Sequence, residues 1–122
     1  MTSISLPHDH GEQPETILLQ KQLSCVAHFQ TVAEVFKQLG DTTRIRIFWL
    51  LCHCEECVLN ISAMLEMSSP AVSHHLRTLK ASGLIVSRRD GKEVYYRAAD
   101  TEESRLLHQM IEQVMEITCP QS

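Results

Sequence analysis

Three cysteines lie within six residues of this chain, in the segment Cys52-His53-Cys54-Glu55-Glu56-Cys57. Thiolates bind soft ions such as zinc, cadmium, lead and trivalent arsenic, which need three or four ligands of this kind. In a chain with no export signal, clustered thiols favour metal or redox chemistry over a disulfide framework. We therefore predict a metal site built from Cys52, Cys54 and Cys57, with Zn or Cd as the effector.

The chain has five cysteines, and the other two lie far away in the sequence. A fourth ligand could come from Cys25, from Cys119, or from His8 and His10 on the tail of a partner chain. Cys25 lies near the apolar face of an expected helix, where packing in the core is the favoured interpretation. For the two tail histidines, a place in a flexible segment is the favoured interpretation, and a metal site is the alternative.

The second segment whose side chains indicate a function is residues 69–97, which are basic. The chain has a formal net charge of −4 at pH 7, yet residues 69–97 hold six Lys or Arg against two acids. One basic segment in an acidic chain is typical of a nucleic-acid contact, although a solvated charged face has the same pattern.

The order of residues within this segment favours duplex DNA. Ser69, Ser73, His74 and His75 belong to the N-terminal half of an expected helix, where small hydrogen-bonding side chains let the backbone approach base edges in the major groove. Either histidine could instead pack or cap. Further cations are placed for phosphates, on the helix and around a tight turn: Arg77, Lys80, Arg88, Arg89 and Lys92.

Hydrophobic periodicity supplies the elements that hold these residues. We expect a flexible tail over residues 1–14 and one domain over 15–122. That domain begins with a helix over 15–39 and a second helix after a cap at Gly40-Asp41-Thr42. A short helix over 58–67, with Ile61, Met64 and Leu65 inward, and a helix over 71–81 come next. Strands over 84–86 and 94–96 are joined by a turn at Asp90-Gly91, and a last helix covers 100–118. The order predicts a mainly α fold with a β-hairpin wing, a winged helix-turn-helix.

Membrane insertion and export are not expected. No run approaches 18 apolar residues, and the first fifteen residues carry no basic-then-apolar signal pattern. We expect a cytoplasmic protein without a membrane partner.

The motifs together resemble the ArsR/SmtB family of metal-responsive repressors, over about residues 28–118. The resemblance is carried by Leu39-Gly40-Asp41-Thr42-Thr43-Arg44-Ile45-Arg46-Ile47, Glu56-Cys57-Val58, Ser69-Pro70-Ala71-Val72-Ser73-His74-His75-Leu76 and Gly91-Lys92-Glu93-Val94-Tyr95-Tyr96. It implies a homodimer built on the first and last helices, a double-stranded operator with an inverted repeat, and metal binding that weakens the grip on DNA.

The resemblance also implies where metals bind, and this sequence departs from it. Cys57-Val58 matches the family's cysteine corner, but Leu59 stands where a further cysteine is usual. A second family site, across the last helices of the dimer, corresponds here to Asp100, Glu102, Gln113 and Glu116, a set without histidine. His108 and Glu112 could substitute, although a solvated helix face is the favoured interpretation. We therefore place the metal at the cysteine corner.

Two other functions compete with metal sensing. The same DNA-binding fold could use its thiols as a redox or persulfide switch, which requires exposed cysteines of low pKa. Cadmium titration of the reduced protein distinguishes metal sensing from the thiol switch, because thiolate charge-transfer absorption reports a metal site. A thiol enzyme is disfavoured, since Cys52 and His53 are adjacent on a helix and point apart.

Overall fold

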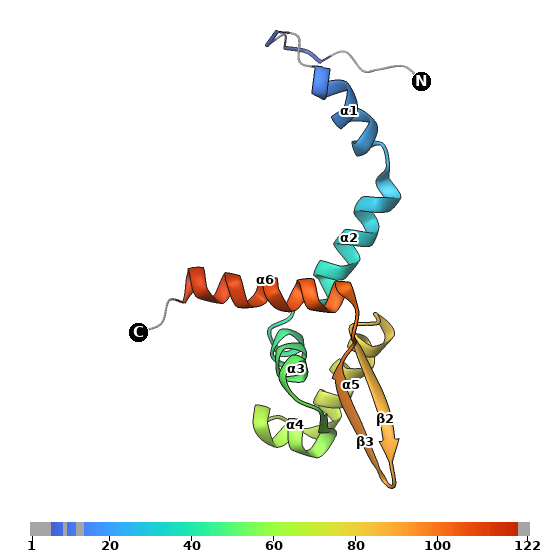
Figure 1. Ribbon diagram of the computed structural model, residues 1–122, viewed down its shortest axis with the longest axis vertical. Helices are drawn as coiled ribbons and strands as arrows, with labels where there is room; N and C mark the ends of the chain where they lie inside the picture. The colour runs from blue at the N-terminus through green and yellow to red at the C-terminus, as the bar shows by residue number, and fades with distance from the viewer. Residues whose placement is uncertain (1–5, 9, 12–13, 120–122) are drawn as a thin grey trace. The chain divides into compact units, whose positions relative to one another are not determined.

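The computed structural model describes residues 6–8, 10–11 and 14–119 (Figure 1). Much of the predicted tail over residues 1–14 therefore lies outside the described residues. The chain forms two compact units, Met1–Glu34 and Val35–Ser122. The predicted domain boundary after residue 14 does not coincide with this division and stays a prediction. No helix in the described part is long and apolar enough to cross a membrane.

The N-terminal part contains two helices, α1 (Pro14–Leu23) and α2 (Val26–Gln38). The single helix predicted over 15–39 is therefore wrong. Ser24 marks the break, and its hydroxyl donates a 2.6 Å hydrogen bond to the carbonyl of Lys21. Serine side chains compete for backbone groups in this way and favour helix ends. Neither glycine nor proline signals the break, which explains why periodicity ran through it.

Two of the next three helices in the second unit begin at a side chain that caps them, and the third begins after Cys57 without such a cap. Helix α3 (Thr42–His53) follows Asp41, whose carboxylate accepts a 3.0 Å hydrogen bond from the Arg44 amide. Helix α4 (Val58–Leu65) is short, as predicted, but Met64 is 55% exposed and does not point inward. Helix α5 (Ser69–Ala81) is capped by Ser68 and buries its predicted apolar side chains Val72, Leu76 and Leu79.

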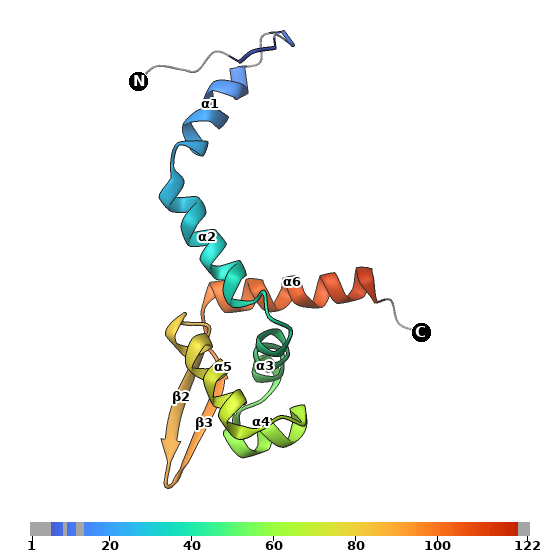
Figure 2. The ribbon, with the colours of Figure 1, turned by 180° about the vertical axis from the view of Figure 1, so that it is seen from behind.

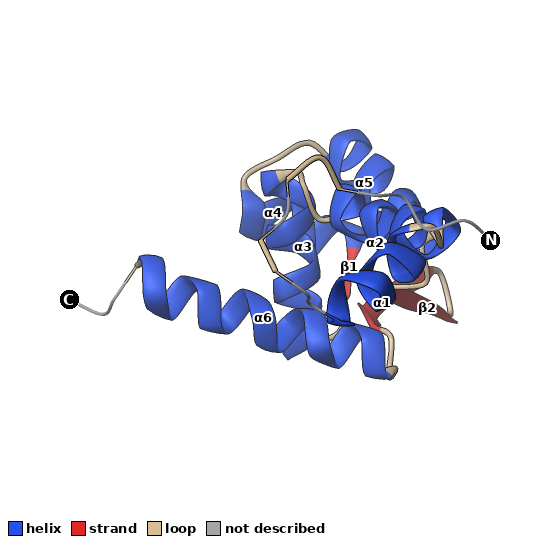
Figure 3. Ribbon diagram, turned by 90° about the horizontal axis from the view of Figure 1, so that it is seen from above, coloured by secondary structure: helices blue, strands red, loops and turns tan. Residues whose placement is uncertain are grey.

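Three antiparallel strands complete the winged unit in the order β1-β3-β2, and Figure 3 shows strands in red beside the helices in blue. Strands β2 (Ile85–Asp90) and β3 (Glu93–Ala98) form the predicted hairpin. Gly91 begins the two-residue loop with φ +65°, which a residue without a side chain adopts readily. Strand β1 (Glu56–Cys57) pairs with Tyr95 and Tyr96 and was not predicted, because two residues carry no periodicity.

The last helix, α6 (Glu102–Thr118), is tied to the hairpin through a buried serine. Ser104 Oγ donates a 3.1 Å hydrogen bond to the carbonyl of Leu84, just before β2. Phe48 of α3 lies at the centre of the core with Ile61 of α4 and Leu76 of α5, all essentially inaccessible to solvent. The hairpin extends away from α6, toward the opposite end of this unit (Figures 1 and 2).

Candidate metal and DNA-binding sites

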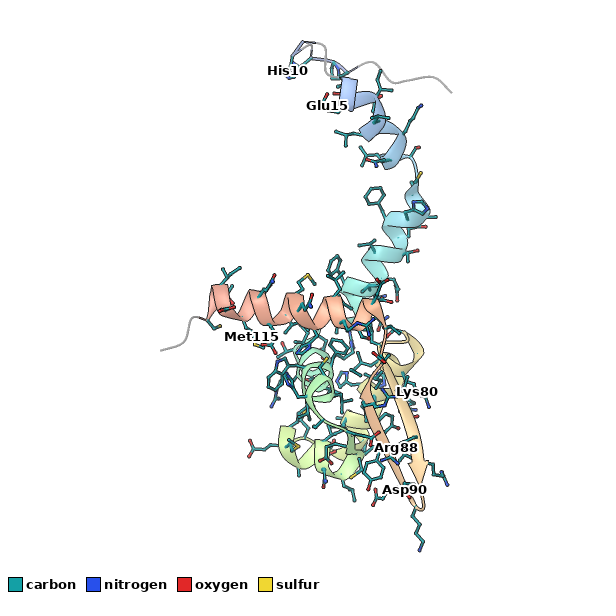
Figure 4. The ribbon with its side chains drawn as sticks, viewed as in Figure 1. His10, Glu15, Lys80, Arg88, Asp90 and Met115 are labelled. Atoms are coloured by element: carbon teal, nitrogen blue, oxygen red, sulfur yellow. The ribbon has the colours of Figure 1, made fainter. Side chains whose placement is uncertain are left out.

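The exposed face of α5 carries most of the predicted DNA-reading residues. His74, Arg77 and Lys80 are exposed, whereas Ser69 and Ser73 are half-buried along the same helix. Lys80 and the wing residue Arg88 belong to neighbouring elements of this unit, since α5 leads directly into β2 (Figure 4). The predicted cations of α5 are therefore accessible to a duplex.

His75 does not belong to this exposed face, which corrects the prediction. Its side chain is only 17% exposed, and its Nδ1 lies 3.9 Å from a carboxylate oxygen of Asp41. One residue along a helix turns the side chain by about 100°, so His74 faces outward while His75 faces the N-terminus of α3. The interpretation of His75 as a packing residue fits this position better than base contact.

The wing holds its three predicted cations in two different ways. Arg89 and Lys92 are exposed near the hairpin loop. Arg88 instead donates hydrogen bonds of 2.6 to 3.0 Å to both oxygens of Glu55, and its guanidinium stands 4.9 Å from the centre of the Tyr95 ring. Successive strand residues point to opposite faces, so Arg88 joins the wing to the segment before β1, while its side chain stays 53% exposed.

This ion pair has an electrostatic signature on both partners. The Arg88 guanidinium lowers the pKa of Glu55 through its hydrogen bonds, and the same bonds raise the pKa of Arg88. Charge-assisted bidentate pairs of this kind fix geometry well, and so the base of the wing is held in place. Glu55 was not singled out from sequence, because its partner lies 33 residues away.

The three clustered cysteines lie at the junction of α3, β1 and α4, but their thiols do not form one group. The structure gathers one set of three or more potential ligand side chains among the described residues, and it contains no cysteine. Cys52 lies in the last turn of α3, Cys54 directly follows that helix, and Cys57 is buried in β1. The predicted convergence of all three is therefore not present in this conformation.

The local structure explains how two of these thiols are held. Cys54 Sγ lies 3.5 Å from the carbonyl of Leu50, the one-turn-back geometry of a helix end. Burial raises the pKa of the Cys52 thiol to about 11, and the negative charge of Glu112 adds to the effect. Burial also raises the pKa of Cys54, with a contribution from Glu56. Both thiols are thus protonated near neutral pH.

Cys52 and Cys54 nevertheless share one open pocket of about 390 Å³. Helix α3 supplies one wall, and the opposite wall comes from the end of β3 and the start of α6, including Asp100, Ser104 and His108. The predicted thiol ligands can therefore be reached from solvent. Cys25, at the break between α1 and α2, and Cys119, at the end of α6, are both exposed, so Cys25 does not pack in a core.

A second group of polar side chains borders the same pocket, and sequence reasoning found only part of it. His53 of α3 meets His108 and Glu112 of α6, with Glu112 Oε1 3.2 Å from His53 Nε2 and 3.0 Å from His108 Nε2. The indole of Trp49 donates a 3.0 Å hydrogen bond to the same Glu112 oxygen. The one-turn spacing of His108 and Glu112 signalled their pairing, but nothing local signalled that His53 joins them.

The sequence of this chain is similar to those of known transcriptional regulators. The profile described as "Bacterial regulatory protein, arsR family" matches residues 41–87. A transcriptional repressor SmtB homolog from Synechocystis is 34% identical over 110 residues, which cover 90% of this chain and 82% of the relative. A CadC homolog from Staphylococcus aureus, named a cadmium resistance regulator, is 42% identical over 77 residues, covering 62% of this chain and 64% of the relative.

Solved structures agree with this likeness. A homodimeric winged helix-turn-helix DNA-binding domain from Mycobacterium bovis superposes with a TM-score of 0.68 and 32% identity. The superposition covers 77% of this chain and 86% of that domain. The predicted winged helix-turn-helix fold is therefore confirmed.

Proposed function

Since the chain belongs to the ArsR/SmtB family of bacterial regulatory proteins, we propose that it is a cytoplasmic, homodimeric repressor that releases its operator when a thiophilic metal binds its cysteines. Its relatives are transcriptional regulators, which places it among DNA-binding proteins and not among enzymes. The observation that carries the sensing part is the accessible Cys52 and Cys54 pair in the α3–α6 pocket.

DNA binding is supported by the charge on one end of the winged unit. Arg77 and Lys80 on α5 and Arg89 and Lys92 on the wing are exposed, in a chain whose net charge is −4. Removing a side chain that contacts phosphate weakens binding to all sequences and lowers the salt dependence, by about one unit in the log–log slope. Arg77→Ala should show this loss, whereas Arg105→Ala on α6 should not.

Dimer formation is supported by apolar side chains that the described part of the chain leaves half or more exposed. On α6, Leu106, Val114 and Ile117 are 50–78% exposed. On α2, Val26, Phe29 and Val32 form a stripe at helical spacing, each more than half exposed. Exposed apolar stripes of this kind mark interaction surfaces, and the similar Mycobacterium bovis domain is a homodimer. A two-fold dimer presents two α5 helices to an inverted-repeat operator.

Metal sensing is supported by the thiol pair in the pocket and by the named function of one relative. The CadC homolog is a cadmium resistance regulator, and cadmium prefers thiolate ligands. Cys57 directly precedes α4 and lies three residues after Cys54 and five after Cys52. Recruiting its sulfur requires rearrangement of the segment between α3 and α4, and β1 joins that segment to the wing strand β3. Through this connection, metal binding at the cysteines can change the position of the wing and so the affinity for DNA.

The test is an anisotropy titration of a labelled inverted-repeat duplex, obtained by in vitro selection with the reduced, metal-free protein. Zn, Cd, Pb and trivalent arsenic are added separately to the wild type and to Cys52→Ser, Cys54→Ser and Cys57→Ser. We expect at least one thiophilic ion to weaken binding 5- to 150-fold, the usual range of allosteric coupling. Cys52→Ser and Cys54→Ser, the two variants that change the pocket, should lose this weakening by metal.

Cys25→Ser removes an exposed thiol outside the cluster and tests whether Cys25 is the fourth ligand: a retained metal response assigns the metal to the cluster alone. Retained metal sensitivity in all three cluster variants would show that the ligand assignment is wrong. Release by peroxide or persulfide, with no effect of any ion, would favour the thiol-switch alternative instead.

A further inference from the structure

The side chains of His53, His108 and Glu112 meet outside the cysteine cluster. The Nε2 atoms of the two histidines are 3.2 Å apart, and Glu112 Oε1 lies 3.2 Å from one and 3.0 Å from the other. These three atoms form a nearly equilateral triangle. Imidazole nitrogen and carboxylate oxygen are the ligands of catalytic-type zinc sites with an open fourth position.

We propose that these three residues bind a divalent cation of the zinc type within one protomer, joining the end of α3 to the middle of α6. Zinc bonds to nitrogen and oxygen of about 2.0–2.1 Å at tetrahedral angles place ligand atoms about 3.3 Å apart. The observed edges differ from this spacing by a few tenths of an ångström. A cation above the triangle therefore requires almost no movement of the side chains.

Proton counting in the cluster favours a cation. A neutral imidazole carries one N–H, so the two Nε2 atoms offer at most two protons for three short edges. The rings also meet edge to face, with centres 4.8 Å apart and their Nε2 atoms 3.2 Å apart. One cation satisfies all three lone pairs at once, whereas hydrogen bonds alone leave one edge without a proton or crowd two together.

The surroundings of the triangle suit a site that exchanges with solvent. The side chains of His53, His108 and Glu112 are 46%, 27% and 45% exposed, so a water molecule can take the fourth position. The Trp49 indole N–H donates to Glu112 Oε1 at 3.0 Å and fixes the carboxylate from behind, as outer partners of metal ligands commonly do.

This site differs from the proposed sensing site in every ligand. It uses no sulfur, and it lies within one chain. It also shares no residue with Asp100, Glu102, Gln113 and Glu116, the positions at which the family resemblance implies a site between protomers. Its presence or absence can therefore be established whatever the cysteines do.

The experiment uses the full chain in a background that removes competing ligands: Cys25, Cys52, Cys54, Cys57 and Cys119 changed to Ser, and His8 and His10 changed to Gln. Cobalt(II) replaces zinc as a coloured probe. We expect one Co²⁺ per protomer, with visible bands typical of four-coordinate nitrogen and oxygen ligands and no sulfur charge-transfer band. Adding His53→Gln or His108→Gln should lower the affinity at least tenfold and remove the bands.

His28→Gln is the matched control, because it removes an exposed histidine of α2 and should leave the titration unchanged. Absence of the four-coordinate spectrum, or equal binding after His53→Gln and His108→Gln, would overturn the proposal. Should the background variant fail to fold, ring NMR of the wild-type chain decides, with Zn²⁺ in excess of the cysteine site, since the His53 and His108 signals must then shift together. Unchanged ring signals would equally overturn it, and neither result depends on whether DNA is released.

Discussion

Two groups of potential metal ligands lie near the end of α3, and they arise in opposite ways. Cys52, Cys54 and Cys57 fall within six residues of sequence, yet the structure does not bring their thiols into one group. His53 and Glu112 are separated by 59 positions, yet their ligand atoms lie 3.2 Å apart. Closeness in sequence is therefore a poor guide to closeness of ligand atoms when the segment crosses from a helix into a strand.

The backbone between the cysteines explains the difference. Cys52 belongs to the regular turn of α3, Cys54 follows the helix in an extended conformation, and Cys57 pairs with Tyr95 across the sheet. Each step changes the direction in which the side chain points. The histidine cluster instead lies between two regular helices, α3 and α6, where one-turn spacing places His108 and Glu112 on one face.

Loss of packing in α3 should disturb both groups together. Phe48→Ala removes a side chain that is inaccessible to solvent at the centre of the core, and such changes cost about 3–5 kcal/mol of unfolding free energy. Urea denaturation measures this loss. Leu59→Ala on α4, where the side chain is 66% exposed, is the control and should change stability by less than about 0.5 kcal/mol. Equal effects of the two would contradict the assigned core.

Linkage to DNA should distinguish the cysteines from a passive thiol cluster. If metal at the cysteines weakens the operator complex, then operator binding must weaken cadmium binding by the same factor, about 5- to 150-fold or 1–3 kcal/mol. Competition with a coloured chelator, in the presence and absence of the selected duplex, measures this factor. A scrambled duplex is the control. Cadmium affinity that ignores the specific duplex would separate the cysteines from DNA binding.

The indole of Trp49 should affect only the histidine cluster. Trp49→Phe keeps an aromatic side chain but removes the indole N–H that holds Glu112. Outer partners of metal ligands contribute about 10- to 100-fold in affinity, and because this one is partly exposed we expect about tenfold weaker cobalt binding. Cadmium-driven release of the operator should stay at the wild-type level. A variant that binds cobalt normally would show that the indole does not position the carboxylate.

The cap of α3 should contribute a smaller, pH-dependent amount to the helix that carries both groups. The Arg44 amide, by its hydrogen bond, lowers the pKa of Asp41 below its ordinary value in the folded protein. The carboxylate therefore stabilises the fold above the unfolded pKa, and this stability is lost as the pH falls through the lower, folded pKa. Asp41→Ala should cost about 1 kcal/mol at pH 7.

Asp41→Asn separates the cap from its charge. Asparagine keeps an oxygen acceptor for the Arg44 amide, so its stability at pH 7 should lie close to the wild type. Its urea midpoint should also vary less than the wild-type midpoint between pH 5 and pH 3. An equal pH response in the two proteins would assign the acid sensitivity to other carboxylates.

Sequence reasoning found the elements but only part of the sites. The cap at Asp41, the buried face of α5 and the turn at Asp90-Gly91 are local signals, and the structure confirms them. The bidentate pair of Arg88 with Glu55 and the contact of His53 with Glu112 are fixed by tertiary packing, across 33 and 59 positions. Periodicity cannot report such contacts, and it also missed the break at Ser24, where a side chain competes for the backbone.

Cadmium-113 NMR of the reduced wild-type chain tests the two-site account most directly, because the chemical shift separates sulfur-rich from nitrogen–oxygen coordination. With excess cadmium we expect a strongly deshielded signal from thiolate coordination, which is lost when Cys52, Cys54 and Cys57 are changed to Ser. We also expect a separate, more shielded signal, which is lost in His108→Gln. A single signal that responds to both sets of substitutions would contradict two independent sites.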